Sequence, residues 1–175
     1  MTRIALLGNA GGGKSTLSRR LRDRLKLPLH SIDQLQWRPG WTPVPADELA
    51  EAHVRILGGP RWIIDGWGDF SLIAERFQKA DTIVLIDYPL WRHYFWALKR
   101  QFTSIFRPRA DGPEGCPLLP MTWPLLKLIR AIDRGAMPRL REYVAQLPTE
   151  KTVVWIHDLG DLQRFHREVD RQALR

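Results

Sequence analysis

The chain has 175 residues, a formal net charge of +8 at pH 7 and a single cysteine, Cys116. This length predicts one domain with a well-buried core, and a lone cysteine excludes an internal disulfide framework. No apolar run reaches the roughly 18 residues that a membrane-spanning helix needs. The first residues lead directly into an apolar strand without room for a signal peptide, so we expect a protein of the reducing cytoplasm.

A glycine-rich motif follows that first strand, which we expect over residues 3–7. The sequence Gly8-Asn9-Ala10-Gly11-Gly12-Gly13-Lys14-Ser15 fits G-x-x-x-x-G-K-[ST] at every fixed position, and a helix is expected next. Glycines let the backbone curl so that its N–H groups surround phosphate oxygens at a helix N-terminus. Lys14 is expected to reach the β- and γ-phosphates, and the Ser15 hydroxyl to bind Mg²⁺. The predicted nucleotide-binding residues are therefore Gly8, Ala10, Gly11, Gly12, Gly13, Lys14, Ser15 and Thr16.

Strands and helices alternate along the rest of the chain. Short apolar runs predict strands at 29–32, 62–64, 82–86 and 153–156, and amphipathic runs predict helices at 14–26, 46–57, 71–78, 89–106, 121–146 and 160–173. We expect Ser71 to cap one helix, an interruption near Pro138 in another, and residues 37–45 to form an irregular loop. This alternation is typical of an α/β fold in which helices cover both faces of a parallel sheet.

Three of the predicted strands end at an aspartate: Asp33, Asp65 and Asp87. Ligands of open α/β sheets bind at the carboxyl ends of the strands, where the glycine-rich motif also lies. Phosphoryl transfer needs a carboxylate for Mg²⁺ and a group that positions or deprotonates the attacking oxygen. We therefore predict Asp65 as a metal residue and Asp33 as a base or metal ligand, although a turn or an N-cap would also explain either. Capping alone explains Asp87, which precedes a helix.

Most of the excess positive charge lies between Arg92 and Arg141, where ten basic residues fall. Repeated prolines and glycines exclude regular secondary structure from residues 107–120 of this segment. A second basic group, on the predicted helix 14–26, is interpreted mainly as a solvated helix face. Such charge favours polyanionic ligands, which include nucleoside triphosphates and nucleic acids.

Several motifs occur in an order and spacing that resemble those of one family. They are Gly8–Ser15, Asp33 with Trp37-Arg38-Pro39-Gly40-Trp41, Trp62-Ile63-Ile64-Asp65-Gly66, Arg76 before Ala80-Asp81-Thr82, Asp87-Tyr88-Pro89 and Glu114-Gly115-Cys116-Pro117. Over nearly its whole length the chain resembles the adenylate-kinase-like P-loop proteins labelled "DNA topology modulation protein". The resemblance departs at Trp67, where that family has asparagine.

The resemblance implies a nucleoside/nucleotide-kinase type of P-loop fold: three layers, with a five-stranded parallel sheet of strand order 2-3-1-4-5. It also implies a lid between the fourth and fifth strands, which coincides with the basic segment at about 92–141 of a single domain, 1–175. Arginines suit a lid because the planar guanidinium offers paired donors to phosphate. Arg100, Arg107 and Arg109 lead into the irregular stretch, and Arg130 and Arg134 lie beyond it. We expect Arg100 and Arg107 to bind the nucleotide. We expect Arg130 and Arg134 to act in catalysis together with Lys14, Asp33 and Asp65.

The acceptor side of the site is less defined. Trp37 and Trp41, with Trp67 nearby, could stack on a base or sugar ring, or could plug the core beneath a long loop. We expect an ATP- and Mg²⁺-dependent phosphotransferase that moves the γ-phosphate to a nucleotide, nucleoside or other small acceptor. The alternative is a nucleic-acid-associated NTP-binding protein or ATPase that affects DNA topology, although no helix-turn-helix, zinc-finger or RRM signature occurs.

Overall fold

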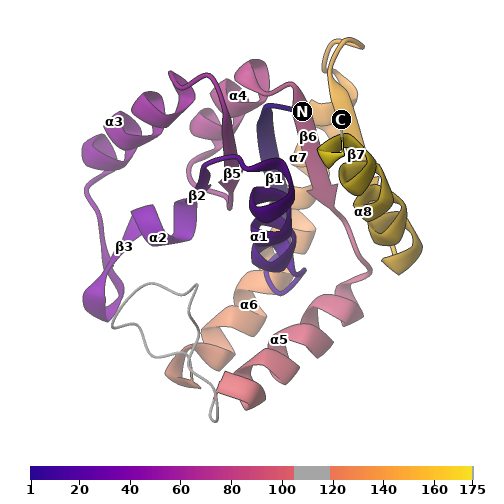
Figure 1. The fold of residues 1–175 in the computed structure, drawn as a ribbon. Helices are drawn as coiled ribbons and strands as arrows, with labels where there is room; N and C mark the ends of the chain where they lie inside the picture. The colour runs from indigo at the N-terminus through magenta and orange to yellow at the C-terminus, as the bar shows by residue number, and fades with distance from the viewer. Residues whose placement is uncertain (105–118, 175) are drawn as a thin grey trace.

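The structure, a computed structural model, describes residues 1–104 and 119–174 (Figure 1). Its centre is a parallel sheet of five strands: β1 (Arg3–Gly8), β2 (Leu29–Ser31), β5 (Trp62–Asp65), β6 (Thr82–Ile86) and β7 (Thr152–Ile156). They lie side by side in the order β2-β5-β1-β6-β7. Counted along the chain among these five strands, that order is 2-3-1-4-5. The predicted fold class and strand order are therefore confirmed.

Helices cover both faces of the sheet (Figure 1). They are α1 (Lys14–Leu25), α3 (Ala46–Leu57), α4 (Phe70–Lys79), α5 (Leu90–Ser104), α6 (Thr122–Ala131), α7 (Met137–Ala145) and α8 (Leu159–Ala173). One core packs α3, α4 and α7 around Phe77, and the second packs α1 and α8 around Phe165. Alternate residues of β1 point into the two cores, Ala5 into the first and Leu6 into the second. Both faces of the central strands are thus excluded from water, which explains their continuous apolar runs.

Between β2 and α3 the chain is more regular than its sequence predicts. The predicted strand end at Asp33 lies instead in the first turn of a short helix, α2 (Ile32–Gln36). The expected irregular loop forms a hairpin of β3 (Trp37–Arg38) and β4 (Thr42–Pro43) around a 3₁₀ turn, η1 (Pro39–Trp41). Ile32 packs into the first core. Burial of this side chain therefore favours the turn that ends β2.

One prediction about helix boundaries is wrong and another is confirmed. Ser71 does not cap α4, because Asp69 is the N-cap and its carboxylate accepts from the Ser71 backbone N–H at 2.8 Å. The interruption expected near Pro138 is present as a π-helical segment, η3 (Ile132–Ala136), between α6 and α7. Pro138 lies in the first turn of α7, where a missing N–H costs little. A 3₁₀ turn, η2 (Leu119–Met121), precedes α6.

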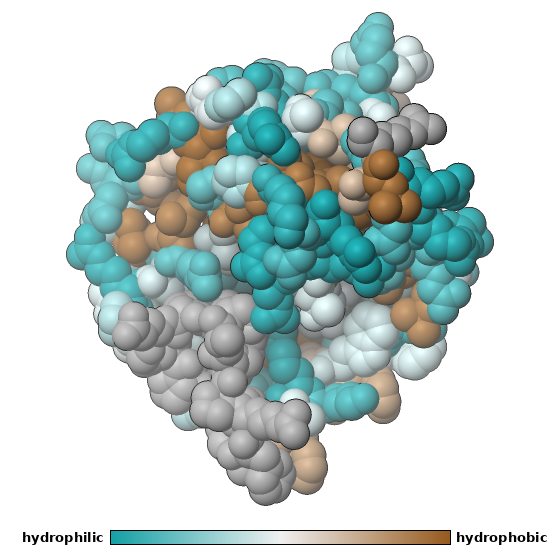
Figure 2. Space-filling model, viewed as in Figure 1, coloured by the Kyte–Doolittle hydropathy of each residue, from teal (hydrophilic) through white to brown (hydrophobic). Residues whose placement is uncertain are grey.

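Of the basic residues on and directly after α1, Arg22, Arg24 and Lys26 are exposed, as predicted, whereas Arg19 and Arg20 are half-buried. Hydrophilic side chains cover this helix near the centre of Figure 2. Two of its arginines, Arg20 and Arg24, bind Asp170 of α8 at 2.8 and 3.2 Å. These ion pairs join two helices of the same layer.

Part of the predicted lid, including Arg107 and Arg109, lies outside the described residues. The lid at about 92–141 and the single-domain organisation therefore stay predictions. In the part of the chain that the structure describes, no helix combines the length and apolar character needed to cross a bilayer.

Candidate functional site

The glycine-rich motif forms a curled loop between β1 and α1. Gly11 and Gly13 have φ values of +74° and +80°, in the left-handed region that favours glycine. A Cβ on Gly11 would lie 2.7 Å from the carbonyl oxygen of His93, so a side chain does not fit there. α1 then begins at Lys14 without a side-chain cap, and the Lys14 ammonium donates to the carbonyl oxygen of Asn9 at 3.0 Å. An uncapped helix N-terminus behind a curled loop favours a bound anion.

Two side chains connect this loop to α5 and α6. Asn9 donates through Nδ2 to the carbonyl oxygen of Ile129 in α6 at 2.9 Å, and its Oδ1 accepts from the N–H of Ala10 at 2.7 Å. In α5, Nδ1 of His93 lies 3.0 Å from the carbonyl oxygen of Ala10. That oxygen can only accept, so Nδ1 carries a proton. Burial lowers the pKa of His93, and Lys14 acts in the same direction, which favours a neutral ring.

Asp65, the last residue of β5, is buried close to the loop. Its Oδ2 accepts from the Ser18 hydroxyl at 3.0 Å, whereas Oδ1 is buried without a hydrogen bond of standard geometry from the described residues. Burial raises the pKa of Asp65. Lys14 opposes this shift, Asp33 adds to it, and the hydroxyls of Ser18 and Ser15 lower the pKa. The loop lysine, the loop serine and the second carboxylate therefore all act on this one group.

The oxygens around Asp65 fit Mg²⁺. This ion prefers oxygen ligands and keeps several waters, so at phosphate sites one or two protein oxygens suffice. The Ser15 hydroxyl and the unsatisfied Oδ1 of Asp65 are such oxygens. Within residues 1–104 and 119–174, no group of three or more His, Cys, Asp or Glu side chains could hold a metal by itself. The donor set therefore suits a metal that arrives with phosphate.

A buried arginine fixes the backbone that follows Asp65. Arg76 of α4 is fully buried and donates to the carbonyl oxygens of Gly66 at 2.6 Å and Trp67 at 3.1 Å. Burial lowers the pKa of Arg76 to about 10, an effect that Asp65 opposes, so the guanidinium stays charged at neutral pH. Gly66 has a φ of +110°, and a Cβ there would lie 3.4 Å from Oδ1 of Asp33. The positive φ is what favours glycine here, since a Cβ at 3.4 Å would only touch the Asp33 carboxylate.

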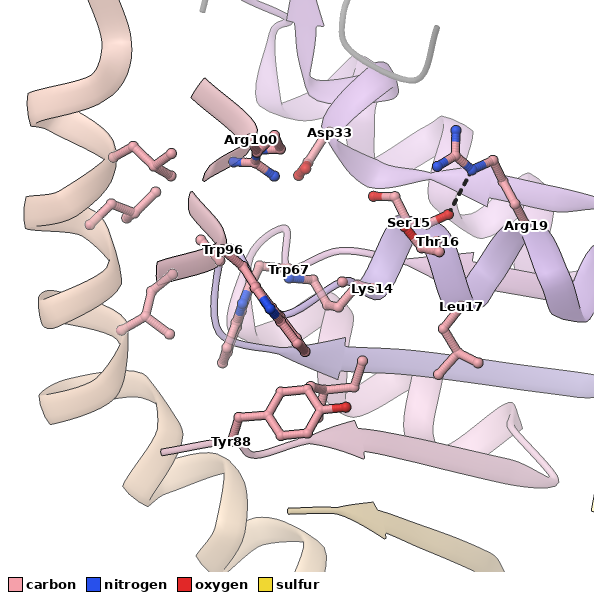
Figure 3. Close-up of a pocket in the computed structure, with 18 of the residues that line it drawn as sticks. Lys14, Ser15, Thr16, Leu17, Arg19, Asp33, Trp67, Tyr88, Trp96 and Arg100 are labelled. Atoms are coloured by element: carbon pink, nitrogen blue, oxygen red, sulfur yellow. Dashed lines mark hydrogen bonds between the residues drawn. The ribbon is translucent and has the colours of Figure 1, made fainter. Parts of the chain in front are cut away.

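These groups open into one cleft of about 1690 Å³. The loop and α1 line it on one side, and α2, the β3–β4 hairpin, α5 and α6 contribute the other walls. In the close-up of Figure 3, Ser15 and Asp33 extend into the cavity, and Arg100 lies beside Asp33. Trp67 and Trp96 lie side by side in the same view, next to Lys14.

Most of the predicted site residues meet at this cleft. Ala10 to Thr16, Asp33 and Arg100 line it. Gly8 and Asp65 do not line it. Asp65 is buried behind the lining, and the carbonyl oxygen of Gly8 accepts from the indole N–H of Trp67 at 2.8 Å, which connects the end of β1 to the lining.

The structure does not bring Arg130 and Arg134 to the cleft. Both are exposed, and the residues of α6 and η3 that line the cleft are apolar, among them Leu125, Leu128 and Ile132. A catalytic role for the two arginines would require a different arrangement of this segment.

Asn9, His93 and Arg76 are supporting residues that sequence reasoning missed. The partner of Asn9 is 120 residues away, and that of His93 is 83 residues away, so no local pattern marks either side chain. Only Arg76 could have been found from its position along a predicted helix. It lies beside Phe77 on the buried side of α4, where an unpartnered charge would be costly.

Asp87 has a structural partner. Its carboxylate accepts two hydrogen bonds from the guanidinium of Arg141 in α7, at 2.8 and 2.7 Å. The Asp87 side chain is only 10% exposed. This paired geometry fixes α7 to the end of β6, so the structure favours a structural role over a catalytic one.

Comparisons with solved structures agree with the observed fold. The chain is similar to shikimate kinase from Acinetobacter baumannii in complex with shikimate, at 16% sequence identity, covering 99% of this chain and 93% of that chain with a TM-score of 0.54. It is also similar to shikimate kinase from Bacteroides thetaiotaomicron, at 12% identity, covering 98% and 97% of the two chains with a TM-score of 0.53. At these identities the likeness shows the fold alone.

No family model matches the chain, and neither does any curated protein. The resemblance to the topology modulation family therefore stays a prediction.

Proposed function

We propose that this chain is an ATP- and Mg²⁺-dependent phosphotransferase that phosphorylates a hydroxyl group of a small molecule. One observation carries the proposal: two carboxylates in different environments act at the phosphate loop, Asp33 in the lining of the cleft and Asp65 buried behind that lining, where Lys14, Ser15 and Asp33 all influence its pKa. Asp65 is buried with an unsatisfied oxygen, which suits a metal ion, whereas Asp33 is exposed in the cleft, which suits an incoming hydroxyl. The fold, shared with shikimate kinases, supports the same reaction class.

The residues divide into a phosphate side and an acceptor side. On the phosphate side the loop backbone holds the triphosphate, and Lys14 neutralises its charge. Ser15 and Asp65 would hold Mg²⁺, which when bound supplies charge neutralisation on the phosphate oxygens. Arg100 and Lys99 of α5 line the opposite wall and stabilise charge on the transferring group. On the acceptor side, Asp33 orients the hydroxyl and takes its proton.

The predicted lid extends this proposal. Arg107, Arg130 and Arg134 act on phosphate only if the segment at about 92–141 closes over the cleft. An adenylate-kinase-like enzyme acting on a nucleotide or nucleoside is one version of the proposal, and a kinase of another small hydroxyl compound is the other.

An acceptor screen tests the proposed reaction. The purified chain is incubated with ATP, Mg²⁺ and a panel of nucleosides, nucleotides, sugars and cyclic polyols, and ADP formation is measured against a sample without acceptor. We expect acceptor-dependent ADP formation, which Lys14→Ala abolishes and Lys127→Ala, an exposed change away from the cleft, leaves intact. ADP formation that no acceptor stimulates would contradict a small-molecule kinase.

Nucleic-acid binding predicts a different result. A protein that neutralises several phosphates loses affinity steeply as salt rises, with a slope of about −0.9 per phosphate contacted on duplex DNA. We expect no such steep, saturable binding of duplex or single-stranded DNA at about 150 mM salt. Stimulation of ATP hydrolysis by DNA, without any small acceptor, would favour the alternative.

A further inference from the structure

The β3–β4 hairpin presents two tryptophans to the cleft. Trp37 lies opposite Pro43 in the hairpin, and Arg38 lies opposite Thr42. The rings of Trp37 and Trp41 meet edge to face, with centroids 5.7 Å apart, and both residues line the cleft. An ion pair between Arg38 and Glu48 of α3, at 2.6 Å, ties the hairpin to the rest of the domain.

These two tryptophans are not core residues. Neither belongs to, or packs against, the two clusters of buried apolar side chains, whereas Trp62 lies in the first cluster with no exposed surface. The interpretation as a plug of the core therefore fails for Trp37 and Trp41, whereas Trp67 packs against the first cluster and lines the cleft as well. Their indole surface faces the cleft.

The backbone at Trp41 is held in an unfavourable conformation. Its φ is +61°, in the left-handed region that bulky residues rarely adopt, directly after Gly40 at +76°. Glycine would occupy this position without strain, yet the chain has its largest side chain there. Strain of this kind is typical of residues that a binding site requires.

Polar groups lie next to this aromatic surface. Asp33 and Gln36 belong to the single turn of α2 that precedes the hairpin, and both line the cleft. Among the described residues, no hydrogen bond or ion pair engages the Asp33 carboxylate. On another wall, Trp67 offers only its ring, because its N–H already donates to Gly8.

We propose that Trp37, Trp41 and Trp67, with Asp33 and Gln36, form the acceptor site, and that the acceptor is a ring bearing several hydroxyl groups, of the sugar or cyclitol class. The apolar C–H face of such a ring packs on indole, while its hydroxyls donate to the carboxylate and the amide oxygen. Lys99 and Arg100 also line the cleft, so phosphorylation of a nucleotide is the competing outcome that the acceptor panel measures. This inference rests on the proposed function.

The transfer balances with the groups present. The hydroxyl oxygen of the ring forms a bond to the γ-phosphorus of ATP, and the bond from that phosphorus to the β–γ bridging oxygen breaks. The electron pair of that bond leaves with ADP. The hydroxyl proton passes to Asp33 and then to water.

The test combines the ring members of the acceptor panel with tryptophan variants. For the ring that gives the most ADP, we expect Trp37→Leu and Trp41→Gly to raise its KM about tenfold or more while the KM for ATP changes less than about twofold, consistent with the loss of stacking on an aromatic side chain. Trp123→Leu, at a tryptophan of α6 that is 68% exposed and outside the cleft lining, is the matched control and should change neither KM.

Trp41→Gly also separates binding from structure. Glycine accepts the left-handed backbone, so the free energy of unfolding should not fall, whereas a merely structural Trp41 would lose stability on truncation. An unchanged acceptor KM in both variants would overturn the inference. Phosphorylation of nucleotides or nucleosides but of no hydroxylated ring in the panel would also overturn it, while leaving the kinase proposal intact. Absence of ATP binding, measured with a non-hydrolysable analogue, would instead count against the proposed function.

Discussion

Nε of Arg76 lies 3.3 Å from Nε2 of His53, and both side chains are fully buried. Arginine can only donate, so Nε2 of the imidazole must accept and the ring must be neutral. Burial, with smaller contributions from the charges of Arg76 and Lys79, lowers the pKa of His53 to about 4. The arginine that fixes Gly66 and Trp67 is therefore supported by a histidine that folding keeps unprotonated.

This pair predicts a pH dependence of stability. The pKa of His53 is about 4 in the folded chain against 6.5 for the free side chain, so the unfolded state binds the extra proton between these values. The free energy of unfolding should thus be at its full value above pH 6.5 and decrease toward pH 4, by up to about 3 kcal/mol. His53→Gln keeps an acceptor for Arg76 and should flatten this decrease in urea titrations. His157→Gln, at an exposed histidine, should retain it. Equal pH profiles for both variants would contradict the assignment.

Lys14→Ala should remove turnover without unfolding the chain. The Lys14 side chain lies against the phosphate loop, lines the cleft and contributes to neither core. Loss of a preorganised cation at a transferring phosphoryl group costs about a hundredfold or more in turnover. Acceptor-dependent ADP formation measures the loss, and thermal unfolding checks the fold. A folded variant with wild-type turnover would exclude a role for this loop in phosphoryl transfer.

Asp65→Asn should raise the Mg²⁺ concentration needed for half-maximal activity by about tenfold or more, because metal affinity depends on the charge and orientation of its ligands. Metal binds the deprotonated carboxylate, and burial raises the pKa of Asp65, so the wild-type requirement for Mg²⁺ should also rise as pH falls toward that pKa. Asp47→Asn, at an exposed residue of α3, is the control. If Asp65→Asn titrates with Mg²⁺ like the parent, the residue only stabilises the turn.

Asn9→Ala and His93→Phe should each weaken the binding of ATP. The first removes the side-chain donor to the carbonyl oxygen of Ile129, which keeps the backbone N–H of Ile132, and the second removes the donor to Ala10, at a cost of about 0.5–1.5 kcal/mol for each hydrogen bond. Isothermal titration with a non-hydrolysable ATP analogue and denaturant unfolding measure the two effects. Since both side chains hold one loop, we expect the double variant to be less affected than the sum of the single variants. Glu142→Gln, on the surface of α7, should change neither quantity.

Arg100→Ala should lower turnover more than Arg130→Ala or Arg134→Ala. Only Arg100 lines the cleft, and charge on the transferring group develops in the transition state, so its loss should reduce kcat at least about tenfold. Single-turnover rates at saturating ATP distinguish this effect from weaker binding. A large loss for Arg130→Ala or Arg134→Ala would instead show that α6 changes position during the reaction, as the predicted lid requires.

The elements that a local pattern encodes could be predicted from the sequence. The strand 82–86 and the helix 46–57 agree with β6 and α3 residue by residue, because continuous apolar runs and amphipathic periods depend on near neighbours. The loop from Gly8 to Ser15 could be predicted too, since its spacing forms a complete local motif, and the left-handed φ values of Gly11 and Gly13 favour glycine.

The supporting contacts of the site could not be predicted in this way. His93 and Arg76 act on groups that approach only after the sheet has formed, and Trp41 adopts a left-handed backbone that its side chain disfavours. Arg130 and Arg134 were assigned by charge and spacing. Neither property says which face of a helix turns toward the cleft.

The π-helical segment η3 limits how the number of residues between α6 and α7 can change. In a π-helix the backbone hydrogen bonds span five residues, one more than in an α-helix. The extra residue in η3 therefore rotates α7 relative to α6. That offset lets Leu125 and Leu128 of α6 line the cleft while Met137 and Leu140 of α7 enter the first core. Deletion of one residue, Gly135, would restore regular α-helical hydrogen bonding and would rotate α7 by about 100° relative to α6. Insertions and deletions in this stretch are therefore constrained by angle as well as by distance.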